Sequence, residues 1–297
     1  MTSTLRATFL HLRPRSWPIV FAHYAGGSAI AFAHSDEPRV TMVLRMLAGA
    51  GIWTICLNGG TLALNTAFDR DEEGAAIGYL ENPPPTPPDL AHFATNLMIL
   101  GLAAAFAMPW GFFWIYTLCF LLSLLYSVPP VRFKARPGAD LAINMAGYGA
   151  FNFAAGALAP GTGLEKPGLL GAVCWLAFAF AFLFGAFYPM TQIYQIPQDV
   201  AKGDRTLVVR FGARRTLGFA IGLIVASGFC QIMAAWMVRM SWWGVGALLI
   251  SSGAWMAFTI DWLLRSEGYP SQKGMYRALK LWAISDLVVI ASFAWGA

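Results

Sequence analysis

The chain has 297 residues, of which 58% are hydrophobic and 12% are charged, and its mean hydropathy is +0.58. A soluble domain carries about 25% charged residues, so this composition excludes an ordinary soluble protein and indicates an integral membrane protein surrounded by lipids. The net charge of +5 requires no nucleic-acid partner, because basic loops beside a bilayer are ordinary and no DNA- or RNA-binding motif is visible.

Nine apolar segments are long enough to cross the hydrocarbon core of a bilayer, which needs about 20 residues per helix. They are expected over residues 17–34, 43–64, 92–109, 111–128, 141–160, 168–189, 216–237, 242–264 and 279–296. The first is not expected to be a cleavable signal peptide, because arginines flank it and no small-residue cleavage site follows. The fold class predicted is therefore an all-α integral membrane bundle.

Basic residues are divided unevenly between the two sides of these segments. If the N-terminus is cytoplasmic, sixteen of the twenty Lys and Arg residues fall on the cytoplasmic side, and the other four are Arg39, Arg45, Lys166 and Arg239. This asymmetry follows the positive-inside rule and places the N-terminus in the cytoplasm. The long polar loops, near residues 65–91, 129–140 and 190–215, then share that side, where we expect any chemistry.

The first of these loops follows the second segment with the sequence LNTAFDRDEE. Asn65, Asp69 and Glu73 stand four residues apart, so on a helix their side chains form one stripe that drifts about 80° while climbing about 12 Å. Further acids crowd beside it. Like charges at the edge of an apolar phase are costly without a cation, so the pattern predicts a divalent-metal site.

The second loop, residues 126–138, reads YSVPPVRFKARPG. Its two prolines are expected to end the fourth helix, because proline fixes the backbone and removes a donor. Arg132, Lys134 and Arg136 then alternate close to the membrane surface. Three cations suit a diphosphate, although the same cluster could serve membrane topology alone.

The third loop, residues 188–215, contains a near-repeat of the first. Gln195 and Asp199 have the same four-residue spacing, and Lys202 and Arg205 follow directly. An internal duplication is one interpretation, since many membrane folds are built from repeats. A polar connection with a purely topological role is the other.

In this order, and after the second, fourth and sixth helices, the segments NTAFDRDEE, YSVPPVRFKARPG and DVAKGDRTLVVRFG resemble the motifs of the UbiA superfamily of intramembrane prenyltransferases. The N-terminal LRPRSW is similar to the usual opening of that family. Glu73 stands where the first family motif, N-x-x-x-D-x-x-x-D, has its last Asp. The resemblance implies one UbiA-like domain over residues 1–297, with nine transmembrane helices around a central cavity and both acidic motifs on its cytoplasmic rim.

Members of the superfamily bind an isoprenyl diphosphate through Mg²⁺ and transfer the prenyl group to an aromatic or other lipophilic acceptor. By motif matching, Asn65, Asp69 and Glu73 would hold one Mg²⁺, and Gln195 with Asp199 a second. Asp69, Asp199 and Lys134 are the candidate catalytic residues. Candidate substrate-binding residues are Arg13, Asn65, Arg70, Lys134, Lys202, Arg205, Tyr148 and Tyr194.

Two positions depart from the family pattern. Thr66 replaces the usual Asp after the motif Asn, and Gln195 offers only a neutral carbonyl to a hard cation. The segment GYLENPPPTPP, residues 78–88, also differs from that of many relatives, so the acceptor is expected to differ.

The transfer reaction would generate an allylic carbocation, which needs a dry cavity with electron-rich walls. The candidate aromatic side chains are Tyr148, Phe151, Phe153, Tyr188 and Tyr194. Simple packing is the favoured interpretation of each of them, because aromatic residues at helical spacing are abundant throughout the chain.

Two other functions remain open. In a terpene cyclase of the same superfamily, an alkene of the prenyl chain itself would capture the cation, without an external acceptor. A transporter or a catalytically silent scaffold is the third reading, although transporters usually bind their substrate near the midplane on broken helices, whereas the polar groups here gather in loops.

The remaining residues to interpret are polar residues and cysteines inside the apolar segments. Asp261 and Asp286 would each cost at least about 2.5 kcal/mol at bilayer depth, so we expect both to face the bundle interior and to pair with Lys280, Arg265 or Arg277, or to act as a base. The four histidines lack metal-ligand spacing and are assigned no chemistry. The four cysteines, with no C-x-x-C pair, are expected to be packing residues.

Overall fold

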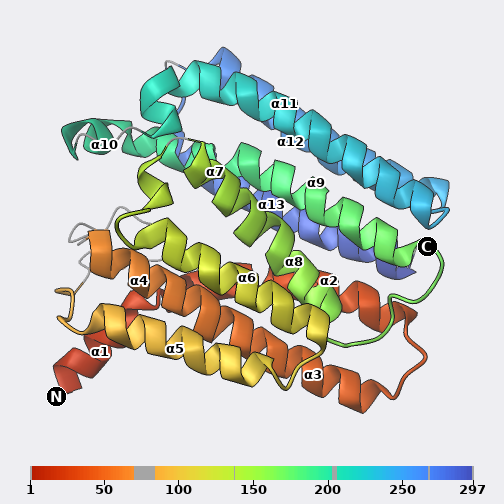
Figure 1. Ribbon diagram of the computed structural model, residues 1–297. Helices are drawn as coiled ribbons and strands as arrows, with labels where there is room; N and C mark the ends of the chain where they lie inside the picture. The colour runs from red at the N-terminus through yellow and green to blue at the C-terminus, as the bar shows by residue number, and fades with distance from the viewer. Residues whose placement is uncertain (1, 70–83, 137, 203–205, 267, 296–297) are drawn as a thin grey trace.

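The computed structural model describes residues 2–69, 84–136, 138–202, 206–266 and 268–295. Within these ranges the chain is helical and contains no strand. The long helices lie side by side in one bundle (Figure 1). The predicted all-α fold is therefore confirmed.

Each of the nine predicted segments corresponds to a helix or to a continuous helical run of the described chain. These are α2 (Trp17–His34), α3–η2–α4 (Arg39–Gly51, Ile52–Gly59, Gly60–Asp69), α5 (Leu90–Ala105), α6 (Trp110–Ser127), α7–η4–α8 (Ala139–Asn144, Met145–Phe151, Asn152–Leu158), α9 (Leu169–Gln192), α11 (Leu207–Met237), α12 (Trp242–Leu264) and α13 (Ser271–Trp295). Short elements connect them: α1 (Thr2–His11), α10 (Ile196–Lys202) and the 3₁₀ turns η1 (Pro14–Ser16), η3 (Phe133–Ala135) and η5 (Ile193–Gln195).

Among the described residues, five helical runs are long and apolar enough by themselves to cross a membrane, namely Arg39–Phe68, Trp110–Ser127, Leu169–Gln195, Leu207–Met237 and Trp242–Leu264. Helix α2 and helix α13 carry polar residues such as His23 and Asp286, both of which are buried inside the bundle. Polar groups at this depth avoid lipid by facing other helices. The chain is thus an integral membrane protein whose less apolar helices turn their polar groups inward.

Helices α2 and α8 touch backbone to backbone. A Cβ added to Gly156 would lie 1.8 Å from the carbonyl oxygen of Tyr24, and one added to Gly27 would lie 2.0 Å from that of Phe153. Ser28 Oγ donates to the Gly156 carbonyl oxygen at 2.9 Å. Small residues allow such close approach, which is how membrane helices associate without a hydrophobic driving force between them.

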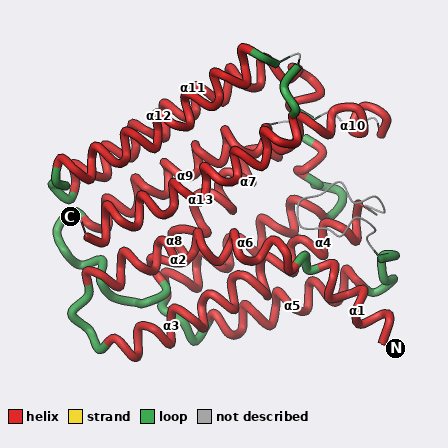
Figure 2. The backbone as a smooth tube through the Cα atoms, turned by 180° about the vertical axis from the view of Figure 1, so that it is seen from behind, coloured by secondary structure: helices red, strands yellow, loops and turns green. Residues whose placement is uncertain are grey.

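The described parts of the loops expected to carry the chemistry lie at one end of the bundle. The end of α4, the start of α7, helix α10 and the N-terminal α1 are found there, whereas the C-terminus lies at the other end (Figure 1). The view from behind shows the same arrangement (Figure 2). Termini at opposite ends are what an odd number of crossings requires.

Candidate functional site

A cavity of about 70 Å³ lies between α2, η2–α4, α6 and α7–η4. Both π-helical segments of the described chain contribute to its wall, η2 through Trp53 and Leu57, and η4 through Tyr148. Short π-helical stretches are rare and occur frequently at functional sites. Most of the wall is apolar; its polar members are Asn58, Thr61, Asn65, Ser123, Tyr126, Asn144 and Tyr148.

The polar side chains of η2–α4 form one stripe along the cavity. Asn58, Thr61 and Asn65 are three and four residues apart, a spacing that keeps them on one helix face. Thr61 Oγ1 lies 2.7 Å from Ser123 Oγ, and Ser127 Oγ donates to Asn65 Oδ1. Two hydrogen bonds from α6 thus hold this face of α4, and the second orients the amide of the first motif.

The described part of the first motif is helical, as its spacing predicts. Asn65 lies in α4 and lines the cavity, and Asp69 is the last residue of that helix. The side chain of Asp69 lies outside the described part of the structure, and so do all atoms of Arg70 and Glu73. The first residue of the predicted stripe, Asn65, therefore lies in the cavity wall.

Arg13 lies beside the first motif. Its Nη2 donates to Thr66 Oγ1 at 3.3 Å, and its side chain is mostly buried. Thr66 is the position where the superfamily usually has Asp. Burial lowers the pKa of the nearby His11, and the positive charge of Arg13 lowers it further, against hydrogen bonds to the Pro85 and Pro84 carbonyls that raise it. His11 is thus neutral near pH 7, so Arg13 supplies the positive charge at this point.

The second motif lies on η5 and α10, at the same end of the bundle as the first (Figure 1). Gln195 Nε2 donates to Tyr194 Oη at 2.9 Å, and Thr206 Oγ1 donates to Asp199 Oδ2 at 3.4 Å. Tyr194, Gln195 and Asp199 are not among the described residues that line the cavity. The side chain of Lys202, the last residue of α10, and Arg205 lie outside the described residues.

Lys134 lies on η3, and its positive charge acts on the carboxylate of Asp140. Asp140 was not among the residues predicted from the sequence. Asp140 Oδ1 accepts hydrogen bonds from Tyr126 Oη at 2.6 Å and from Tyr188 Oη at 3.1 Å. Asn144 Nδ2 donates to the same oxygen at 3.1 Å. Since Tyr126 and Asn144 line the cavity, this network joins Lys134 to its wall.

The candidate aromatic residues fall into two groups. Tyr148 in the cavity wall stacks on Phe184 with ring centroids 5.5 Å apart, and Tyr188 stacks on the same ring at 5.9 Å. Phe153, by contrast, is fully buried and packs on Phe180 at 5.0 Å, away from the residues of the cavity wall. Phe151 packs, partly buried, against the core formed by η2, α5 and α6.

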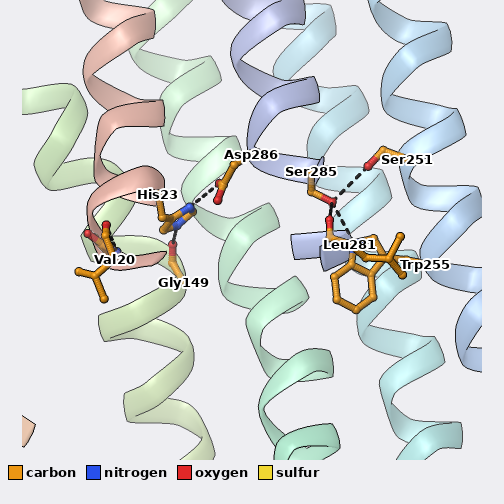
Figure 3. Close-up of polar contacts among 9 residues, drawn as sticks. Val20, His23, Gly149, Ser251, Trp255, Leu281, Ser285 and Asp286 are labelled. Carbon is orange, nitrogen blue, oxygen red and sulfur yellow. Dashed lines mark hydrogen bonds and ion pairs between the residues drawn. The ribbon is translucent and has the colours of Figure 1, made fainter. Parts of the chain in front are cut away.

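The intramembrane acids have different partners. Asp261 pairs with Arg265 at 2.7 Å in an exposed contact, one of the pairings expected. The expected pairing of Asp286 with Lys280, Arg265 or Arg277 is wrong, because Asp286 Oδ1 lies 2.6 Å from Nδ1 of His23, in the interior of the bundle (Figure 3). His23 Nε2 donates to the Gly149 carbonyl oxygen at 2.9 Å.

The donor atoms of the two motifs suit a hard cation. Asn65 and Gln195 offer amide oxygens and Asp199 offers a carboxylate, the ligand types that Mg²⁺ takes in proteins. No group of three or more His, Cys, Asp or Glu residues that could hold a metal ion occurs within the ranges given above. The side chains of Asp69 and Glu73, which would complete the first set, belong to the remainder of the chain.

Comparisons with known structures agree on the fold. A solved structure from work on digeranylgeranylglyceryl phosphate synthase in membranes matches with a TM-score of 0.73 at 16% identity, covering 98% of this chain and 99% of that one. A UbiA homolog from Archaeoglobus fulgidus matches with a TM-score of 0.67 at 20% identity, covering 97% and 98%. The same homolog bound to GPP and Mg²⁺ matches with a TM-score of 0.64, covering 96% and 99%. No curated protein gives a significant match.

The model of the UbiA prenyltransferase family matches residues 19–284, which include all of the cavity wall and both motifs. This match extends over most of the chain. The chain belongs to the UbiA prenyltransferase family.

Proposed function

We propose that this protein transfers a prenyl group from an isoprenyl diphosphate to an aromatic or other lipophilic acceptor, with Mg²⁺, at the cytoplasmic side of the membrane. The observation that carries the proposal is the cavity, whose apolar wall ends in Asn65, next to Arg13 and the first acidic motif.

The residues divide into a charged end and an apolar wall. Asn65, Asp69 and Glu73, and Gln195 with Asp199, would hold Mg²⁺, which supplies electrostatic stabilisation of the departing diphosphate when it is bound. Cations around the same end would bind diphosphate oxygens; they are Arg13, Arg70, Lys134, Lys202 and Arg205. The A. fulgidus homolog bound to GPP and Mg²⁺ supports a prenyl diphosphate and Mg²⁺ as the molecules bound at this site.

The wall of the cavity would hold the prenyl chain and exclude water from the reacting carbon. Trp53, Leu57 and Val20 supply apolar surface, and Tyr148 presents a ring that a cation can approach. An aromatic face stabilises a nearby cation by roughly 0.5–2 kcal/mol. Exclusion of water also favours capture of the cation by the lipophilic acceptor over hydrolysis.

The test is product analysis by mass spectrometry. Purified protein in lipid nanodiscs is given Mg²⁺ and prenyl diphosphates of several lengths, with and without a panel of aromatic acceptors. A prenylated acceptor with release of diphosphate is expected, whereas cyclic products formed without any acceptor would identify a terpene cyclase instead.

A variant of the first motif tests whether that motif is required for the activity. Asp69→Asn is expected to abolish turnover while the protein still inserts and folds, and Asp261→Asn, which removes only an exposed ion pair, is the matched control. Full activity of the Asp69 variant would overturn the proposed site.

A further inference from the structure

Asp140 is a partly buried acceptor of several hydrogen bonds in the first turn of α7. Its Oδ1 receives the hydroxyl protons of Tyr126 and Tyr188, and Tyr188 Oη also lies 3.3 Å from Oδ2. Every one of these partners is a donor, which is the surrounding expected of an ionised carboxylate, since that form only accepts. Burial raises the pKa of Asp140 more than these hydrogen bonds and the positive charge of Lys134 lower it.

The direction of the Tyr126 hydroxyl follows from its neighbours. Asn144 Nδ2 donates to Tyr126 Oη at 3.2 Å, so the hydroxyl proton is directed to Asp140 Oδ1, 2.6 Å away. A hydroxyl oxygen has two lone pairs, and here Asn144 and the Tyr188 hydroxyl share them. Because Tyr188 Oη also reaches both oxygens of Asp140, it can leave its lone pair to a proton that arrives from the cavity, whose wall includes Tyr126.

Prenyl transfer has to release one proton. The bond between the prenyl carbon and the diphosphate oxygen breaks, and its electron pair leaves with the diphosphate. A bond forms between that carbon and the acceptor, and the acceptor loses the hydrogen it carried at the attacking atom or beside it. In an apolar cavity this proton needs a base within hydrogen-bond reach.

We propose that Tyr126 and Asp140 form the proton acceptor of this reaction, with Tyr126 taking the proton of the acceptor while its own hydroxyl proton passes to Asp140 Oδ1. This inference rests on the proposed function. The acceptor's X–H bond breaks and leaves its electron pair on the acceptor, an O–H bond forms on Tyr126, and the former Tyr126 proton ends on Asp140. Tyr126 therefore remains neutral before and after the step, and the single negative charge lost is that of Asp140.

The position of Asp140 allows the proton to leave afterwards. It is the second residue of α7, at the end of the bundle where the polar loops lie (Figure 1), and it is only partly buried. Water at that end can remove the proton and restore the carboxylate. Of the carboxylates whose side chains are described, Asp140 is the one bonded to residues of the cavity wall.

The test separates ionisation from proton removal. Geranyl diphosphate labelled with ¹⁸O in its bridging position is given with Mg²⁺ and either water alone or 1-naphthol as the acceptor. Scrambling of the label into the non-bridging oxygens reports ionisation and return, while geraniol or geranylated naphthol reports completed transfer. The variants are Tyr126→Phe and Asp140→Asn, and Ser251→Ala is the control, because it removes a hydrogen bond to Ser285 and does not line the cavity.

A general base contributes about 10²- to 10⁴-fold, so Tyr126→Phe and Asp140→Asn are expected to lower product formation at least about 100-fold while label scrambling continues near the wild-type rate. Ser251→Ala is expected to stay within about fivefold of wild type. If the two variants form product as fast as the control, or lose scrambling in parallel with product, the proton-acceptor role is wrong and the proposed function stands. If the wild type shows neither scrambling nor product, the proposed function itself fails.

Discussion

The pair formed by His23 and Asp286 gives a prediction about what holds the bundle together. Their side chains are 1% and 5% exposed and join α2 to α13, and His23 also bonds the Gly149 carbonyl in η4 (Figure 3). Because a carbonyl oxygen only accepts, Nε2 of His23 carries a proton, and a second proton lies between Nδ1 and Asp286 Oδ1. The pair is therefore neutral overall, and each partner depends on the other.

The loss of stability caused by each substitution depends on which buried group loses its partner. His23→Phe strands the carboxyl of Asp286 among the rings of Phe180 and Trp282, which lie 4.5 and 4.9 Å from the imidazole centroid. Removing one partner of a buried pair costs about 3–5 kcal/mol. Asp286→Asn is milder, because an amide N–H can donate to Nδ1 of a neutral imidazole, and we expect a loss of at most about 1.5 kcal/mol.

Thermal unfolding in detergent measures the order of these stability losses. We expect His23→Phe to lower Tm by at least about 6 °C, taking about 2 °C per kcal/mol for a chain of this size. The double variant His23→Phe/Asp286→Leu should recover part of that loss, with a coupling energy of about 0.5–3 kcal/mol. Ser251→Ala, which removes one hydrogen bond to Ser285, is the control and should cost about 0.6 kcal/mol. A His23→Phe protein as stable as the control would refute the reasoning.

Three further predictions concern packing and metal. Gly156→Ala should lower Tm, because its Cβ would lie 1.8 Å from a backbone oxygen of α2, whereas Gly222→Ala, with no atom within 4 Å, should be neutral or slightly stabilising in the same melt. Ser127→Ala should raise the Mg²⁺ concentration for half-maximal activity about tenfold, since Ser127 orients Asn65, and an unchanged titration would contradict that role. Chelation of Mg²⁺ with EDTA should stop product formation without changing helix content by circular dichroism, and added Mg²⁺ should restore it.

The helices were predictable because their signal is local. Each span was identified by the length of an apolar run, and that length is set by the bilayer rather than by contacts elsewhere in the fold. The clearest difference is α11, which begins at Leu207 instead of residue 216. Thr206 caps it by accepting from the Val209 amide, and Gly212, with φ 75°, separates a short first segment, residues 207–211, from the rest of the helix. The apolar composition of the sequence identifies only the long span of α11 from residue 216 onward.

The site could be predicted only where its residues are close in sequence. The spacing of Asn65 and Asp69 indicated a helical stripe, and α4 carries both. The partners of Asp140 come from three different helical elements, and His23 and Asp286 are 263 residues apart. No spacing rule connects such residues, since their contact depends on how the helices pack.

The last turn of α6 joins the two halves of the proposed reaction. Ser127 orients the amide of Asn65, on the side where the diphosphate would leave, and the preceding residue, Tyr126, bonds Asp140, on the side where the proton would leave. Two prolines follow after Val128, and the helix ends before them. Because adjacent residues of one helix end cannot move independently by much, α6 fixes the distance between the bond that breaks and the base that acts. Such fixed placement of reacting groups is where much of the rate enhancement of an enzyme arises.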